Sequence, residues 1–434
     1  MPAEQSTVAA LCAALIRFDT SNRGSGDAEG EREAAEFVAS HLDADGYPPV
    51  LLESAPRRSN VVVRVPGTDP AAPALLVHAH LDVVPADAAS WAFPPFAGEI
   101  RDGFVCGRGA VDMKDMCATV LTVLRGWART GRRPRRDVVV AFVADEEDGG
   151  RYGARWLAAE HPELFDGCVV GISESGGYTA DVDGVRFYPV ATAERGTMHL
   201  RITAHGRAGH GSRPNDDNAV VSLAEAIARV AAHRWPVQLT PVVEAFLARS
   251  CAAVGVAYDR DDIDATLRRL GKIGAMAAAV VRPSVTPTVL RAGYKVNVIP
   301  ETASAEFDTR TLPGDPAVLQ AELDRLLGPR VTRDYLRCDD ALAAPMDSPW
   351  FEAMAEALRA EDPGAVVVPY CMGGGTDAKA FATLGIDGYG FAPLLIDSDG
   401  GYDYRAMAHG VDERVPIKGL EFGVRVLDRF MSTV

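Results

Sequence analysis

The sequence predicts an α/β protein in which a smaller α+β domain is inserted into a larger domain. Three observations predict it. Apolar runs without polar alternation are separated by helical stretches, a later region alternates apolar and polar residues, and the chain has 434 residues, more than one core usually carries. The larger domain is expected to hold a mostly parallel central sheet flanked by helices, and the inserted domain an antiparallel sheet.

The first elements of the larger domain follow one another along residues 1–187. Apolar residues at helical spacing predict a helix that contains Phe37 and ends near Gly46, and a second helix over 114–130 that ends near Gly131. Four apolar runs are predicted to be strands: 60–65, 74–78, 137–145 and 168–173. Because these strands show no polar alternation, helices are expected to cover both faces of their sheet.

The character of the sequence changes near residue 188. The segments 198–203 and 303–310 alternate between apolar and polar side chains, which indicates a sheet with one polar face. Helical stretches lie between them, and after "LPGDP" the chain again alternates helices with apolar strands. We therefore assign residues 188–313 to the inserted domain, and residues 1–187 and 314–434 to the larger domain.

Composition and charge exclude several classes of partner. The formal charge of −16 argues against non-specific binding of nucleic acid or of anionic membranes. The apolar stretch 8–16 has no basic region before it and is interpreted as a helix, not a signal peptide, and 274–281 is too short to span a bilayer. Seven scattered cysteines without a CxxC pair are typical of reduced thiols, so we expect a cytoplasmic protein.

Polar residues that suit metal binding lie where predicted elements begin or end. In "LLVHAHLDVVPAD" (75–87), His78, His80 and Asp82 are two residues apart, so in an extended chain they point the same way. The whole candidate set consists of His80, Asp112, Glu146, Glu147, Glu174 and His409. Taken singly, each residue has an ordinary interpretation, such as a helix N-cap, an acidic turn or a surface histidine.

The geometry of an open α/β sheet makes these residues more informative together. The carboxyl ends of its strands share one edge, where ligands bind in such folds. Carboxylates and an imidazole in one crevice would repel one another and lose hydration, and a bound cation removes this cost. Two histidines with three carboxylates suit two zinc-like ions that share one carboxylate. The sequence therefore predicts two divalent ions, Zn²⁺ first, with Mn²⁺ or Co²⁺ as alternatives.

A set of motifs occurs in an order that resembles a known family: "HLDVVP", "GRGAVDMK", "DEE", "GHGSRP", "NVIP", "DTRTLPG", "GGGTDA" and "HGVDE". The family is that of the dinuclear zinc amidohydrolases, which includes aminoacylase-1, glutamate carboxypeptidase and succinyl-diaminopimelate desuccinylase. The resemblance covers essentially the whole chain. The segment "TPTVLRAGYKVNVIP" is similar to the subgroup of vacuolar carboxypeptidase S and N-acyl amino acid hydrolases.

The resemblance implies a metal-dependent catalytic domain in which each candidate residue has a role. The implied metal ligands are His80, Asp112 as the bridging carboxylate, Glu147, Glu174 and His409. Asp82 would orient His80, as metal-bound imidazoles usually require, and Glu146 would be the general base for a metal-bridging water. His78 matches no general feature of the family, and we expect it to be structural or to support a ligand.

The inserted domain is expected to be a lid that contributes to the site. The resemblance implies that His210 helps to hold the tetrahedral oxyanion, often across a dimer interface, and that Asn297 and Arg310 contact the substrate carboxylate or backbone. Gly375 and Thr376, in the glycine run "GGGTD", could present backbone N–H groups to the same carboxylate, or form only a tight turn. The resemblance further predicts a homodimer formed through this domain.

These inferences predict a hydrolase that cleaves an amide bond adjacent to a free carboxylate, in a small N-acyl amino acid or a dipeptide. Aminoacylase and dipeptidase or carboxypeptidase activities fit equally well. Two other classes stay open. A non-catalytic metal-binding relative would have no need of Glu146, and a two-metal phosphoesterase would need a phosphate clamp, for which only Arg108 and Lys114 lie near the ligand loops.

Overall fold

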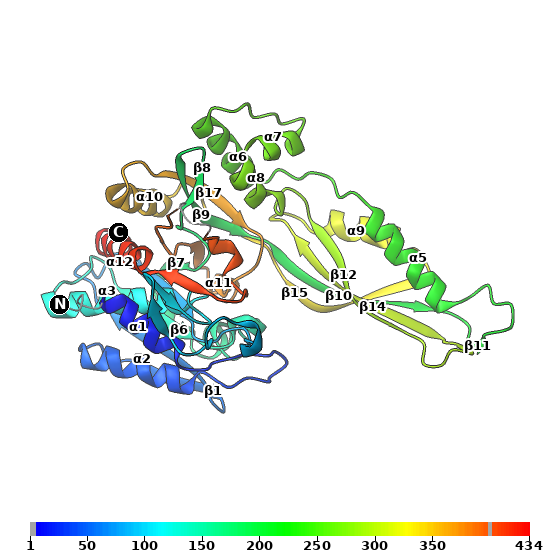
Figure 1. Ribbon diagram of the computed structural model, residues 1–434, viewed down its shortest axis with the longest axis horizontal. Helices are drawn as coiled ribbons and strands as arrows, with labels where there is room; N and C mark the ends of the chain where they lie inside the picture. Colours follow the sequence, from blue (N-terminus) through cyan, green and yellow to red (C-terminus); the bar gives the residue numbers. More distant parts are fainter. Residues whose placement is uncertain (1–5, 398–401) are drawn as a thin grey trace.

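The computed structural model describes residues 6–397 and 402–434 and has two parts, a rounded body and an arm that extends from it (Figure 1). The body is built around a ten-stranded mixed sheet with the strand order β1-β2-β6-β3-β7-β18-β9-β16, in which β17 and β8 also pair with β9. Its strands are β1 (Val50–Ala55), β2 (Arg58–Val65), β3 (Ala74–His80), β6 (Val138–Val143), β7 (Cys168–Ser173), β8 (Ala180–Val182), β9 (Val185–Glu194), β16 (Leu342–Ala343), β17 (Val366–Met372) and β18 (Asp387–Gly390).

The centre of this sheet is parallel, because β3 pairs in parallel with both β6 and β7, and β18 pairs in parallel with β7. All four apolar runs predicted as strands belong to it. β6 is buried at every position, as expected for a strand covered on both faces. The predicted α/β class with a mostly parallel centre is therefore confirmed.

Helices cover both faces of the sheet. One face packs against α1 (Thr7–Ile16), α2 (Arg32–Ala44), α3 (Lys114–Thr130), α10 (Pro349–Glu361) and α12 (Ile417–Thr433), and the other against α4 (Ala154–Glu160), α11 (Ala378–Ala382) and the 3-10 turn η3 (Pro162–Phe165). The side chains of β2 divide between the faces: Val61 and Val63 join the first core and Val62 the second. Helix α3 ends as predicted, since Gly131 is left-handed at its C-terminus with φ 68°.

A small sheet brings the two ends of the body's sequence together. It consists of β4 (Glu99–Arg101), β5 (Phe104–Cys106) and β19 (Arg414–Pro416), with the short turns η1 (Ala88–Ser90) and η4 (Tyr404–Ala406) nearby in sequence. β19 pairs antiparallel with β5, so that Arg414 lies opposite Cys106. The segments just after His409 and just before Asp112 are thereby neighbours.

The arm contains a second, antiparallel sheet with the order β12-β14-β10-β15. The strands of this sheet are β10 (Gly196–His205), β12 (Ser284–Ala292), β14 (Thr302–Thr311) and β15 (Val331–Asp339). The arm also contains the separate two-stranded ribbon of β11 (Gly209–His210) and β13 (Val298–Ile299) and the helices α5 (Ala219–Ala232) and α9 (Ala317–Leu327). The helices cover one face, where Met198, Leu200 and Ile202 are buried, and the predicted alternation in β10 leaves the opposite face polar.

The packing divides the chain differently from the predicted limits of 188 and 313. β9 belongs to the body sheet, whereas α9 and β15 belong to the arm. Between the arm segments, α6 (Pro241–Val254), α7 (Ile263–Arg269) and α8 (Gly271–Ala278) join the core of the body, where Phe246 packs on Tyr370 with ring centroids 5.8 Å apart. Within the described residues, no helix has the length and apolar character that a bilayer crossing requires.

Candidate metal centre

The parallel strands carry the predicted ligands to one edge of the body sheet. His80 is the last residue of β3, Glu146 and Glu147 form the turn η2 (Glu146–Asp148) after β6, and Glu174 directly follows β7. Because these three strands run in the same direction, their carboxyl ends meet at that edge. The predicted convergence of these side chains is what the structure shows.

Asp112 lies between two histidines. Its Oδ1 is 3.0 Å from Nε2 of His80, and its Oδ2 is 3.2 Å from Nε2 of His409. The same nitrogen of His409 lies 3.1 Å from Oε2 of Glu147. A carboxylate that presents one oxygen to each of two imidazoles has the arrangement that a bridging ligand needs.

Two groups of donor atoms are close enough to hold metal ions. The ligand atoms of His80, Glu146 and Glu174 lie within 4.8 Å of one another, and so do those of His80, Asp112 and Glu147. Oε1 of Glu147 is buried and has no hydrogen-bond partner among the described residues. A buried carboxylate oxygen without a partner is costly unless a cation binds it, so the donor set fits metal ions.

The electrostatics of the cluster indicate the same. Burial, followed by repulsion from neighbouring carboxylates, raises the pKa of Glu146 and of Glu174 well above the ordinary value. Burial acts in the same direction on Asp112, but hydrogen bonds from His409 and His80 hold its pKa below the ordinary value. The hydrogen bonds of His409 to Asp112 and Glu147 raise its pKa to about 10. The buried cluster holds more negative charge than its hydrogen bonds and histidines stabilise. Two divalent ions would neutralise this charge.

Asp82 is fully buried and supports both His80 and the η2 turn. Nδ1 of His80 lies 2.9 Å from the backbone oxygen of Asp82, which can only accept, so Nδ1 carries a proton and Nε2, which faces Asp112, is the nitrogen that would bind metal. The carboxylate of Asp82 accepts hydrogen bonds from the backbone N–H of Glu146 at 3.1 Å and of Glu147 at 3.2 Å. The predicted orienting residue thus also fixes the position of the two glutamates.

Behind Asp82 lies a buried network that the sequence did not predict. Asn22 donates to Asp82 at 2.9 Å and to Asp145 at 3.0 Å. Arg58 donates to Asp145 at 2.7 Å and, through two nitrogens, to Glu31 at 2.9 Å each. These partners are distant in sequence and follow no shared motif. Only Asp145 belongs to one of the quoted motifs, "DEE".

Arg108 and Lys114 do not form the phosphate clamp that a phosphoesterase would need. Nη1 of Arg108 donates to Glu413 at 2.6 Å, and Lys114 is fully buried and donates to the backbone oxygen of Phe18 at 2.8 Å. Glu413 also accepts the N–H groups of Gly109 and Val111, so its function is to hold the loop that leads to Asp112.

A cavity of about 260 Å³ lies between the metal centre and the polar face of the arm sheet. It is lined by Glu146, Glu147 and His409 from the centre, by Thr197, His199, Arg310 and Arg337 from the arm, and by Gly149, Arg155, Gly374, Gly375, Thr376, Asp377, Lys379 and Ala380. Arg310 and the glycine run therefore lie where a substrate would bind. Asp377, which is 6% exposed, is a cavity residue that sequence reasoning missed although it stands in the quoted motif "GGGTDA".

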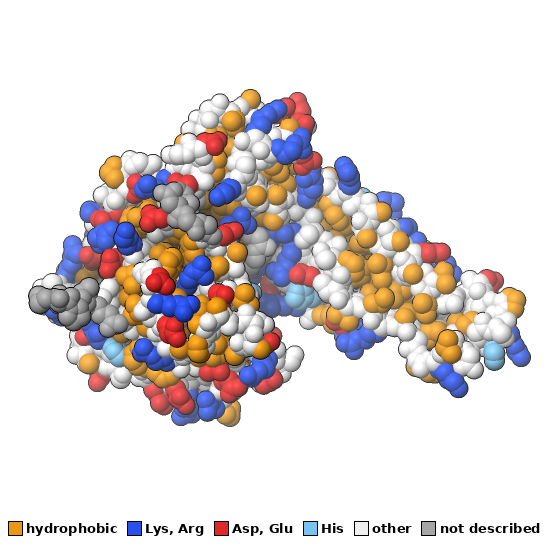
Figure 2. All heavy atoms as spheres, in the orientation of Figure 1, with side chains coloured by type: hydrophobic (Ala, Val, Ile, Leu, Met, Phe, Trp, Pro, Cys, Tyr) orange, Lys and Arg blue, Asp and Glu red, His pale blue; other side chains and the backbone are white. Residues whose placement is uncertain are grey.

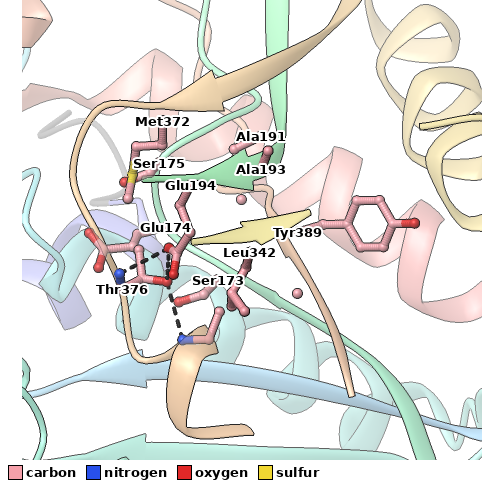
Figure 3. Close-up of a pocket in the computed structure, with 13 residues that line it drawn as sticks. Ser173, Glu174, Ser175, Ala191, Ala193, Glu194, Leu342, Met372, Thr376 and Tyr389 are labelled. Atoms are coloured by element: carbon pink, nitrogen blue, oxygen red, sulfur yellow. Dashed lines mark hydrogen bonds between the residues drawn. The ribbon is translucent and has the colours of Figure 1, made fainter. Parts of the chain in front are cut away.

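The expected use of the Thr376 N–H for a substrate is not supported. Both the N–H, at 3.0 Å, and the hydroxyl, at 2.9 Å, donate to Oε2 of Glu194, as the dashed lines in Figure 3 show. The pocket drawn there lies beside Glu174 and has a volume of about 20 Å³, which is room for about one water molecule. Thr376 therefore holds the buried Glu194 in place.

His210 and Asn297 do not reach the metal centre of their own chain. Both are exposed and lie at the β11–β13 ribbon, where the N–H of Gly211 donates to the backbone oxygen of Asn297 at 2.9 Å. Figure 1 shows β11 at the end of the arm that points away from the body.

His78 also has no part in the cluster. It is 2% exposed and packs on Phe381 with ring centroids 4.9 Å apart, and burial, followed by the charge of His80, lowers its pKa to about 3.

Fold and donor set together define the class of this protein as a dinuclear metallohydrolase. The model of peptidase family M20/M25/M40 matches residues 76–433, and the chain belongs to that family.

Two curated relatives illustrate the similarity. The chain is 28% identical over 390 residues to the N-fatty-acyl-amino acid synthase/hydrolase PM20D1 of Xenopus tropicalis, which covers 83% of this chain and 72% of the relative. It is also 28% identical over 389 residues to aminoacylase-1 of Homo sapiens, and this alignment covers 88% of this chain and 86% of the relative.

Two solved structures share the fold of this chain. The M20 metallo-carboxypeptidase Sso-CP2 from Sulfolobus solfataricus superposes with a TM-score of 0.72 at 16% identity and covers 99% of both chains. Human carnosine dipeptidase 1 superposes with a TM-score of 0.68 at 15% identity and covers 98% of this chain and 95% of its own.

Proposed function

We propose that this chain hydrolyses an amide bond next to a free carboxylate, in an N-acyl amino acid or a dipeptide. The observation that carries the proposal is the placement of Asp112 between His80 and His409, with Glu146 in the same cluster and a cavity in front of them. The names of the relatives support the substrate class, since they are an aminoacylase and an N-fatty-acyl-amino acid hydrolase.

We further propose two divalent ions, Zn²⁺ foremost and Mn²⁺ or Co²⁺ as alternatives. His80, Asp112 and Glu174 would hold one ion, and Asp112, Glu147 and His409 the other. Imidazole nitrogens and carboxylate oxygens are ligands that zinc takes in catalytic sites. When bound, such ions polarise a carbonyl group and lower the pKa of water to ~7.

The residues of the chain would handle the protons of the reaction. Glu146 would accept a proton from the attacking water and deliver it to the nitrogen of the departing amine, so that the C–N bond breaks and the products are a carboxylate and an amine. Asp82 would keep Nδ1 of His80 protonated and hold Glu146 in place through its backbone N–H.

We also propose a homodimer in the cytoplasm, in which His210 and Asn297 of one chain serve the site of its partner. Their exposed position on the β11–β13 ribbon, remote from their own centre, supports this arrangement (Figure 1). The seven free cysteines are compatible with a reducing compartment. The charge of −16 supports a small-molecule substrate in preference to nucleic acid or a membrane.

Turnover of a panel of N-acetyl amino acids and dipeptides, measured with and without a chelator, tests the proposal. Hydrolysis should stop with the chelator and return when Zn²⁺, Mn²⁺ or Co²⁺ is added. Turnover that is insensitive to chelation would contradict the metal-dependent mechanism. Release of phosphate from a generic phosphate ester would favour the phosphoesterase class instead.

The variant Glu146→Gln separates catalysis from metal binding. Its rate should fall on the order of 10²- to 10⁴-fold or more, because the base is lost, while elemental analysis finds the metal content unchanged. Glu160→Gln, an exposed glutamate at the end of α4, is the matched control and should keep full activity. A Glu146→Gln variant with the wild-type rate would refute the assigned base. A wild type that binds metal without turnover would be the non-catalytic relative.

A further inference from the structure

The chain passes between the body and the arm along two antiparallel strands whose pairing is interrupted at the passage. On the body side, Glu194 of β9 pairs with Leu342 of β16. On the arm side, Thr197 of β10 pairs with Asp339 of β15 in the same register. Between these two pairs the strands do not pair with each other. Backbone oxygens at such an interruption need other partners where they are shielded from water.

One lysine of the body supplies these partners. Lys379 lies in α11 and is 8% exposed. Its Nζ donates to the backbone oxygen of Arg195, between β9 and β10, at 2.6 Å. It also donates to the backbone oxygen of Asp340, between β15 and β16, at 3.1 Å. Because an ammonium group has three donors, this single group joins both strands of the passage to a helix of the body.

The positive charge of Lys379 is balanced at the same place. Oε1 of Glu194, the last residue of β9, lies 3.8 Å from Nζ and has no hydrogen-bond partner among the described residues. Oε2 of Glu194 accepts the N–H and the hydroxyl of Thr376, as Figure 3 shows. Removal of either partner of a buried ion pair leaves an uncompensated charge, which is costly. Glu194 therefore keeps the ammonium group at the interruption.

The glycine run before α11 leaves the space that this lysine occupies. A Cβ on Gly375 would lie 2.9 Å from Cε and 3.2 Å from Nζ of Lys379. Both residues line the cavity in front of the metal centre. Figure 2 shows that the surface of the molecule is hollowed where the arm leaves the body. The run "GGGTD" therefore allows the lysine side chain to reach the passage between the two parts.

We propose that Lys379 is a positioning residue that fixes the angle of the arm against the body, and with it the width of the cavity. Thr197 and His199, which line the cavity from the arm, lie on β10 just after Arg195. A rotation of the arm about the interruption would move both residues relative to Glu146 across the cavity. The effect on catalysis rests on the proposed function, whereas the effect on the arm does not.

A distance measurement on the metal-loaded protein tests the position of the arm. Spin labels at the exposed positions Glu160→Cys, in α4, and Glu225→Cys, in α5, report the distance between body and arm by pulsed electron paramagnetic resonance. Cys338→Ser removes the exposed native cysteine, and dilution with unlabelled protein leaves distances within one chain. The wild type should give one narrow distribution, and Lys379→Met a broader and displaced one. Lys418→Met, an exposed lysine of α12, is the matched control and should keep the narrow distribution.

A double variant separates the lost contacts from the lost charge. Lys379→Met alone leaves the buried Glu194 without a counter-charge, which by itself lowers stability. Lys379→Met combined with Glu194→Gln removes both charges and still lacks the donors to Arg195 and Asp340. The double variant should therefore fold and again show the broad distribution. A wild-type distribution in the folded double variant would overturn the proposal.

Turnover of N-acetyl-L-methionine connects the arm to catalysis. In the double variant kcat/KM should fall on the order of 10- to 100-fold, because groups that face the substrate are misplaced, while elemental analysis finds the metal content unchanged. A displaced arm with the wild-type kcat/KM would overturn the positioning role of Lys379. A wild type without turnover, in which removal of Lys379 still displaces the arm, would refute the proposed function and support the contact at the passage.

Discussion

At the residue scale, the metal centre depends on a buried charge that is not itself a ligand. The side chain of Arg58 is 6% exposed and is paired with Glu31 and Asp145, whose side chains are 0% and 2% exposed. Asp145 in turn accepts from Asn22, which also binds Asp82. Removal of the guanidinium would leave two buried carboxylates without a counter-charge, which costs far more than loss of a surface pair.

We therefore predict that Arg58→Met lowers the unfolding free energy by about 3–5 kcal/mol, measured by denaturant titration. The control is Arg359→Met, which removes an exposed pair with Glu352 and should cost no more than about 1 kcal/mol. If both variants lose the same stability, the buried network contributes nothing beyond an ordinary surface ion pair.

Residues whose chemistry shows in a local motif could be predicted from the sequence, and their buried partners could not. His80 ends an apolar strand, and Glu146 and Glu174 follow apolar strands, so the direction of the sheet alone placed them at one edge. No local sequence pattern identifies Asn22 and Arg58, because their partners lie on other elements and only the folded chain brings them together.

At the element scale, the η2 turn lies in the connection from β6 to α4, and the two ends of this connection are in direct backbone contact. A Cβ on Gly153, the residue before α4, would lie 1.7 Å from the backbone oxygen of Ala144, just after β6. The atoms of Ala144 that it would meet are backbone atoms, which cannot move aside as a flexible side chain could. A methyl group on residue 153 would therefore force the end of the strand and the start of the helix apart. The turn with Glu146 lies between these two points.

Gly153→Ala should therefore lower stability by about 1–3 kcal/mol or more and lower kcat with it. Gly126→Ala, in the exposed middle of α3 with no atom within 4 Å of the added Cβ, is the matched control and should be neutral or stabilising by up to about 1 kcal/mol. Thermal midpoints and turnover of both variants check this. A Gly153→Ala protein with an unchanged midpoint would show that the two backbones can separate freely.

Elements were predicted better than their assignment to the two domains. The helix–strand pair α9 and β15 repeats the local pattern of the body and was placed there, but Leu319 and Leu323 of α9 pack in the core of the arm. Conversely, α6 lies between two arm segments in sequence and packs on β17 through Phe246. Helical periodicity tells which side of a helix is apolar, but not which sheet covers it.

At the scale of the whole molecule, the arm carries candidate site residues at both of its ends. Its near end lines the cavity of its own chain through Arg310 and Arg337. Its far end carries the exposed β11–β13 ribbon with His210 and Asn297, and next to it stand Tyr294, 80% exposed, and Val296, 103% exposed. Exposed apolar side chains beside these two candidate residues are compatible with the proposed dimer.

If the far end completes the site of a second chain, two inactive variants should restore each other. Glu146→Gln keeps His210, and His210→Ala keeps Glu146. In a mixed dimer, the centre of the His210→Ala chain then receives the intact His210 of its partner, while the other centre lacks both groups. Random assortment makes half of the dimers mixed with one working site each, so re-association of equal amounts should give about a quarter of the wild-type activity. Activity that stays at the level of the separate variants, with mixed dimers present by mass, would mean that His210 does not act across the interface, and a monomer with full activity would exclude the shared site altogether.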